Sequence, residues 1–187
     1  TGGAHMIFGA KPDIAVFSKA LGNGYPISAI IGRKAVMSIA EESFISSTNW
    51  TNSIGLVAAI ATIKKFKKRK IANHLAKMGE KIKNGWEKLA KKHSLKIHIS
   101  GAIHYHFEFE DRNPLVVKTL FTQLMLAEGF LATTAFYASY AHKNYHISKY
   151  LTAVDKTFKI IATALENNNI EQKLKGAVCH ADFRRLT

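Results

Sequence analysis

PDIAVFSKALGNGYP, residues 12–26, is the stretch from which the fold and chemistry of this 187-residue chain can be inferred. Residues 14–17 form a short apolar run between turn-forming residues, a pattern that predicts a buried strand. Lys19 follows this strand and opens a loop that contains Gly22 and Gly24. Partial burial there favours the neutral amine, which can form a Schiff base with a carbonyl compound. The glycines let the backbone bend sharply and let a flat ligand approach closely.

An isolated Lys-x-x-Gly-x-Gly pattern fits an ordinary turn beside a solvated lysine better than a ligand site. The complete string is more specific, because Pro-Asp-Ile-x-x-x-Ser-Lys-x-Leu-Gly-x-Gly-Tyr-Pro closely resembles the cofactor-lysine segment of class III aminotransferases. These are pyridoxal-phosphate enzymes of fold type I, and the chain is most similar to their glutamate-1-semialdehyde aminotransferase (aminomutase) type. The resemblance continues through residues 27–33, 44–51 and 55–62, and more loosely to the C-terminus. It covers only the second half of the family's usual length.

The resemblance implies an α/β fold in two parts. Residues 1–67 are expected to be the C-terminal part of the large parallel-sheet, cofactor-binding domain. Residues 68–187 are expected to form a small α+β C-terminal domain.

The resemblance also implies the site. Lys19 would hold pyridoxal 5′-phosphate as a Schiff base and later carry a proton during amino-group transfer to or from a small amino or keto substrate. Ser18 and Thr48 would bind the cofactor. The threonine that matches Thr48 contacts the phosphate of the neighbouring subunit, which implies a homodimer with a shared active site. Relatives often have a Ser-Gly-Asn/His-Pro run shortly after this threonine, whereas this chain has WTNS at residues 50–53.

Two parts of such a site are expected from residues before Thr1. In relatives, an Asp partner for the pyridine nitrogen and a phosphate-binding turn both precede the cofactor-lysine strand. We therefore expect a companion N-terminal half, no competent transamination by these residues alone, and exposed apolar surface on residues 1–67. The alternative is a catalytically incomplete fragment that acts as a binding or assembly module with a companion chain.

Composition narrows the class of protein. Hydrophobic residues make up 47% of the chain, and it has only 12 Gly and 3 Pro, which indicates a folded protein. No apolar run has the length of a membrane span, and the N-terminal residues do not resemble a signal peptide. The single cysteine, Cys179, rules out an internal disulfide. These features favour a cytoplasmic protein.

The net charge of +14 raises the alternative of a nucleic-acid-binding protein. Most of the excess positive charge lies in residues 64–92, which contain twelve Lys and Arg but only two acidic residues, Glu80 and Glu87. The segment has helical periodicity and lacks interleaved aromatic residues, so we expect a solvated helical face and no nucleic-acid partner. His104, His106, Glu108 and Glu110 share one face of a predicted strand, where side chains in a row rarely converge on one ion. We therefore expect no metal.

Hydrophobic periodicity predicts the remaining elements. Helices are expected at residues 33–40, from about 53 to 66, at 71–93, at 115–128 and at 145–167, with Thr51 or Ser53 capping the second; the second and third could be one kinked helix. Strands are expected at residues 27–31, 95–99, 104–110 and 130–134. An aromatic patch at residues 136–140 with His142 is expected to pack in the core, or to lie on the substrate side of the site.

Overall fold

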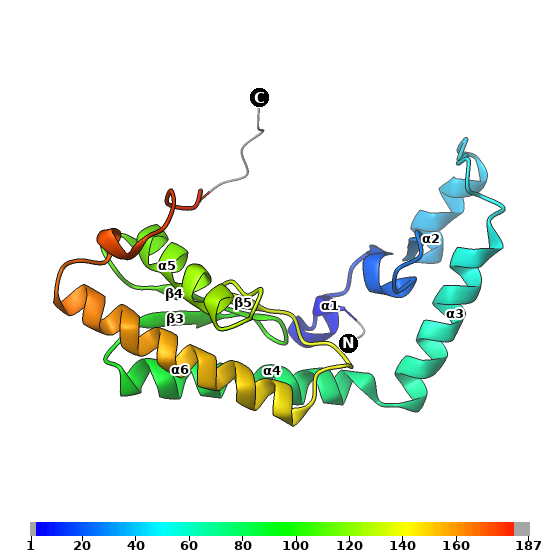
Figure 1. The fold of residues 1–187 in the computed structure, drawn as a ribbon. Coiled ribbons are helices and arrows are strands. Elements are labelled where there is room, and N and C mark those ends of the chain that lie inside the picture. Colours follow the sequence, from blue (N-terminus) through cyan, green and yellow to red (C-terminus); the bar gives the residue numbers. More distant parts are fainter. Residues whose placement is uncertain (1–2, 182–187) are drawn as a thin grey trace. The chain divides into compact units, whose positions relative to one another are not determined.

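The computed structural model describes residues 3–181 and divides the chain into two compact units (Figure 1). The first unit is Thr1–Ala72 and the second is Asn73–Thr187. Each is described by itself below.

The first unit contains a two-stranded antiparallel ladder. Strand β1 (Ile14–Phe17) pairs with β2 (Ala29–Gly32), and the register places Ile14 opposite Gly32 and Phe17 opposite Ala29. Both strands were predicted from their apolar runs. Burial of β1 was not borne out, since Ile14 is 46% and Val16 65% exposed. Among the described residues β1 pairs with β2 alone, so one of its edges stays open.

Short helices surround this ladder. Helix α1 (Ala4–Phe8) precedes it, the single 3-10 turn η1 (Lys19–Leu21) connects its strands, and α2 (Lys34–Met37) with η2 (Ser38–Glu41) follows it. The last two together match the helix expected at residues 33–40.

Helix α3 (Ser53–Lys68) begins at a polar cap, which sequence reasoning placed one residue too early or too late. The cap is Asn52, whose Oδ1 accepts a hydrogen bond of 3.0 Å from the N–H of Ile54. Neither Thr51 nor Ser53 has that role. Lys70 has a left-handed φ of 48°, which separates α3 from α4 (Ile71–Lys92), so the two are distinct helices. The cations of residues 64–70 are exposed, which confirms the prediction of a solvated face there.

Exposed apolar side chains are concentrated in the first unit, as the sequence predicted. They come from α1, from both strands and the loop between them, from η2, from the segment before α3 and from α3 itself: Met6, Ile7, Phe8, Ile14, Val16, Tyr25, Ile30, Ile31, Ile39, Phe44, Ile45, Trp50, Ile54, Leu56, Val57, Ile60 and Ile63. Exposed apolar side chains in such number are typical of a protein segment that contacts other protein. In the part of the chain that the structure describes, no helix is both long and apolar enough to cross a membrane.

The second unit packs three long helices on a small antiparallel sheet of order β3-β4-β5. The strands are β3 (Ile97–Ser100), β4 (Tyr105–Phe109) and β5 (Ala135–Phe136), and the helices are α4, α5 (Pro114–Ala127) and α6 (Asn144–Glu166). A short turn, η3 (Glu171–Lys173), follows α6. The helices agree with the predicted ranges to within one or two residues.

The strand predicted at residues 130–134 is wrong. The N–H of Phe130 bonds the carbonyl of Met125 at 2.9 Å, so Phe130 still closes the end of α5. Pairing with β4 starts only at Thr134, whose carbonyl accepts from the N–H of Phe107. The strand that forms is β5, two residues long.

Phe107 lies at the centre of the core of the second unit. It belongs to the buried face of β4 with Tyr105 and Phe109, while the alternate residues of the strand are exposed, as predicted. Its ring meets Trp86 of α4 at 4.8 Å, Phe121 of α5 at 5.4 Å and Phe158 of α6 at 5.9 Å between centroids. All three helices therefore cover the same face of the sheet.

Helices α4 and α6 run side by side and parallel (Figure 1). Their contacts keep an almost constant offset in sequence, from Lys81 with Asn144 to Lys92 with Asp155. Close approach is possible at Gly85, because a Cβ there would come within 2.5 Å of the Leu151 side chain. Midway along the pair, the buried indole N–H of Trp86 donates to the hydroxyl of Tyr150 at 3.1 Å.

Replacement of Tyr150 by Phe tests this buried bond. The variant removes the acceptor of the Trp86 N–H while keeping the ring, and an unsatisfied buried donor costs about 1–3 kcal/mol. We expect urea unfolding followed by circular dichroism to show that loss in the free energy of unfolding. Tyr137→Phe is the matched control, because Tyr137 is 72% exposed. Equal stability of the two variants would contradict the prediction.

Candidate active site

Lys19 is the first residue of η1 and directly follows Ser18, at the end of β1. It has a φ of 51°, in the left-handed region that residues other than glycine seldom occupy. Such local strain is concentrated at functional sites, where the surrounding structure enforces it. The Lys19 side chain is exposed in this unit, so the partial burial expected from the sequence is not provided by the described residues.

The loop after Lys19 folds back tightly on itself. Gly22 is buried, and a Cβ at this position would lie 2.2 Å from the carbonyl oxygen of Tyr25 and 2.7 Å from the Ile27 side chain. The φ of Gly22 is −88°, so it is space rather than backbone conformation that excludes a side chain. Asn23 and Gly24 then take positive φ values of 48° and 112°. The loop therefore turns sharply just after Lys19, through a position at Gly22 that has no room for a side chain.

The start of α3 packs against the end of this loop. Gly55 is buried, and a Cβ there would lie 3.1 Å from both the Pro26 carbonyl oxygen and the Ile27 Cβ. The sequence analysis missed this contact. Its signal was a glycine inside a helical pattern, which indicates close approach to another backbone.

An ion pair closes the opposite end of the ladder. Arg33 Nη1 lies 2.9 Å from Asp13 Oδ1, next to the Ile14–Gly32 pair. Both side chains are 65% exposed, so the pair contributes at most about 1 kcal/mol. Opposite charges at the outer ends of two pairing strands were the signal that sequence reasoning overlooked.

Thr48 lies in a separate exposed turn before α3. The N–H of Trp50 bonds the Ser47 carbonyl at 3.1 Å, and that of Asn52 bonds the Asn49 carbonyl at 3.0 Å. Since Asn52 caps α3, the hydroxyls of Ser46, Ser47 and Thr48 remain outside the helix end. The structure thus places Ser18 and Lys19 together in one loop and Thr48 in another segment, and the roles of all three stay predictions.

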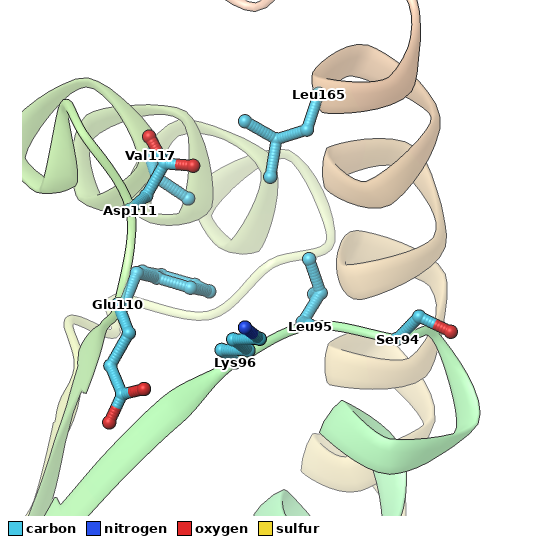
Figure 2. Close-up of a pocket in the computed structure, with 8 residues that line it drawn as sticks. Ser94, Leu95, Lys96, Glu110, Asp111, Val117 and Leu165 are labelled. Carbon is cyan, nitrogen blue, oxygen red and sulfur yellow. The ribbon is translucent and has the colours of Figure 1, made fainter.

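The second unit has a hollow of about 190 Å³ between the start of β3, the end of β4, α5 and α6 (Figure 2). Lys96, Glu110 and Asp111 line it on the sheet side, and Val117 and Leu165 on the helix side. It is smaller than the roughly 300–1,000 Å³ of typical ligand pockets. We assign no ligand to it.

The aromatic patch at residues 136–140 with His142 lies beside two further histidines, His74 and His146. His74 Nε2 donates to the carbonyl of His142 at 2.9 Å, and the N–H of Ser139 donates to His142 Nδ1 at 3.0 Å. The His142 ring also packs on Phe136, with centroids 5.0 Å apart. Burial, and then the nearby His146 and His74, lower the pKa of His142 below its usual value of 6.5.

The His and Glu side chains on the outer face of β4 do not form a metal site. Within residues 3–181, no three His, Cys, Asp or Glu side chains are grouped so that they could hold a metal ion. His106 instead bonds the Ser100 hydroxyl of β3 at 2.8 Å.

Comparisons with known proteins show the family. The family Aminotransferase class-III matches residues 1–165. A glutamate-1-semialdehyde 2,1-aminomutase of Clostridium botulinum is 31% identical over 171 residues, which are 81% of this chain and 40% of that protein. A 3-aminobutyryl-CoA aminotransferase of Cloacimonas acidaminovorans is 38% identical over 102 residues, 54% of this chain and 25% of that protein. The chain therefore belongs to the class III aminotransferases, and it spans well under half the length of these relatives.

Solved structures show the same fold. The PLP internal aldimine form of the FumI protein of Sphingopyxis superposes with a TM-score of 0.80 at 22% identity, over 87% of this chain and 40% of that one. An omega-transaminase of Sphaerobacter thermophilus gives a TM-score of 0.78 at 17% identity, over 87% and 41% of the two chains. The chain thus has part of the fold of the fold type I transaminases.

The lowered pKa of His142 predicts a pH-dependent stability. Because the pKa of His142 is lower in the folded chain, the unfolded chain takes up a proton on this histidine at a higher pH than the folded chain does. The free energy of unfolding therefore has its full value above pH 6.5, and it decreases as the pH falls from 6.5 toward the lowered pKa of the folded state. We expect urea unfolding over this range to show a weaker pH dependence for His142→Gln than for the wild type. His98→Gln, at an exposed position of β3, is the control that keeps the wild-type dependence. Identical pH profiles for all three proteins would contradict the role of His142.

Proposed function

We propose that this chain is the cofactor-lysine half of a pyridoxal-phosphate-dependent aminotransferase or aminomutase, with Lys19 as the residue that binds the cofactor covalently. The observation that carries the proposal is Lys19 itself, held with a φ of 51° between the β1–β2 ladder and a glycine-lined loop. Class III aminotransferases use pyridoxal phosphate, and the chain's membership of that family supports the same cofactor here. When bound, this cofactor withdraws electrons from the substrate carbon that carries the amino group.

The residues of this chain have distinct tasks in that reaction. The ladder fixes the position of Lys19, because Phe17 opposite Ala29 sets where the loop begins and ends. The Lys19 amine would hold the cofactor, and as a free amine it could accept and return a proton at the substrate carbon that carries the amino group. Ser18, next to it, offers a hydroxyl for hydrogen bonding to the cofactor. Gly22 lets the loop close tightly on Tyr25 and Ile27, because a Cβ at this position would clash with both.

The substrate class is proposed from one of these two relatives. The glutamate-1-semialdehyde 2,1-aminomutase matches 81% of it, which favours amino-group transfer of the glutamate-1-semialdehyde type. The 3-aminobutyryl-CoA aminotransferase has higher identity over a shorter segment, so an amino-acyl thioester is the competing substrate class. Turnover of the assembled enzyme with each of the two compounds distinguishes them.

The experiment on Lys19 uses borohydride reduction. The chain is combined with the segment that precedes the cofactor-lysine strand in its relatives, loaded with pyridoxal phosphate, reduced and digested. We expect peptide mass mapping to find the pyridoxyl group on Lys19. Lys19→Ala should abolish this label, whereas Lys34→Ala, at an exposed position of α2, should leave it in place. Labels on other lysines with Lys19 unmodified would refute the assignment and favour a binding or assembly module.

Thr48 is proposed to contact the cofactor phosphate of a second subunit. Its exposed turn, flanked by the exposed side chains of Phe44, Ile45 and Trp50, is available for such a contact. Chains with Lys19→Ala and chains with Thr48→Ala, each assembled with the preceding segment, should be weakly active alone. After mixing, each mixed dimer regains one intact site, and transamination should recover. If activity does not return although mixed dimers form, Thr48 does not act across subunits.

A further inference from the structure

The chain after α6 forms a segment that the family match does not include. The match ends at residue 165, and the segment of interest is residues 169–179, which we name the C-terminal strap. It starts after Asn168, whose left-handed φ of 50° ends α6, and it continues through η3. Figure 1 shows it leaving α6 and passing beside α5.

The strap is held against α5 mainly by hydrogen bonds between side chains of α5 and backbone atoms of the strap. The side-chain amide of Gln123 makes two of them, donating to the Lys173 carbonyl at 2.9 Å and accepting from the Lys175 N–H at 2.7 Å. Thr119, one turn earlier in α5, accepts from the N–H of Cys179 at 2.9 Å. The Cys179 thiol donates to the carbonyl of Leu115, a further turn earlier, at 3.7 Å.

Apart from these hydrogen bonds, the strap buries little of its surface. Ile170 and Leu174 pack against the core only partly buried, and most of the other strap residues are exposed. Asn169 Oδ1, at the start of the strap, is buried without a hydrogen-bond partner among the described residues. Segments with little buried apolar surface and few bonds open at a lower free energy than the domain as a whole.

We propose that the C-terminal strap is a latch on α5, which opens and closes as a separate unit while the rest of the second unit stays folded. Gln123 is its main fastening, because its amide pairs with two strap residues as a neighbouring strand would. Thr119 is the second fastening. In the closed state Cys179 is half-buried against Leu115, and opening exposes its thiol together with the Leu115–Thr119–Gln123 face of α5.

Cys179 provides a direct readout, because it is the single cysteine of the chain. Alkylation of the full chain by iodoacetamide, followed by mass spectrometry, measures how often the strap opens. Gln123→Ala removes both hydrogen bonds of this side chain to the strap and should raise the alkylation rate about ten-fold. Thr119→Val removes one bond to the strap, together with the bond from the Thr119 hydroxyl to the Leu115 carbonyl within α5, and should raise the rate about three- to five-fold. Gln172→Ala, at an exposed strap position outside these bonds, is the matched control and should keep the wild-type rate.

The dependence of the rate on urea separates strap opening from unfolding. Below the unfolding transition, the wild-type rate should hardly change with urea, because a local opening exposes little surface. The proposal is overturned if Gln123→Ala and Gln172→Ala react at the same rate. It is also overturned if alkylation rises with urea as steeply as global unfolding, or if folded Cys179 reacts as fast as in the denatured chain.

Discussion

The candidate site depends on one steric constraint, the absence of space for a side chain at Gly22. The Tyr25 carbonyl oxygen lies 2.2 Å from where a Cβ would be, so the loop can close in this way only around a glycine. Because the loop is tied to the ladder at Phe17 and at Ala29, this closure fixes the backbone that enters it. Lys19, three residues before Gly22, lies in the same loop and has a left-handed φ of 51°.

Different interactions hold the two units together. In the second, one aromatic residue, Phe107, joins three helices to the sheet, so the core is closed by residues of the unit itself. In the first, local hydrogen bonds and close glycine contacts define the backbone, while large apolar side chains point to solvent. This contrast parallels the comparisons, in which relatives have more than twice the matched length.

Periodic patterns were sufficient to predict the helices and most strands, because alternation and helical spacing depend on which residues are apolar. The buried face of β4 is an example, with Tyr105, Phe107 and Phe109 inward. Features set by a few backbone bonds were not predictable in this way. Phe130 looked like a strand residue, but its N–H closes α5. Likewise, the motif identified Lys19, but its left-handed φ of 51° was not predicted, because neither its residue type nor the apolar pattern around it indicates such a conformation.

The small sheet of the second unit also bears on solubility. Its two edge strands are β3 and β5, and open edges are where sheets of different molecules join and aggregate. Here β5 has only two residues and β3 has four. The side chain of His98 in β3 is exposed, and so is that of Lys96, the residue just before this strand. Short edges with charged or polar neighbours offer little backbone for a foreign strand to pair with. The sheet can therefore remain open on both edges without becoming a template for fibre growth.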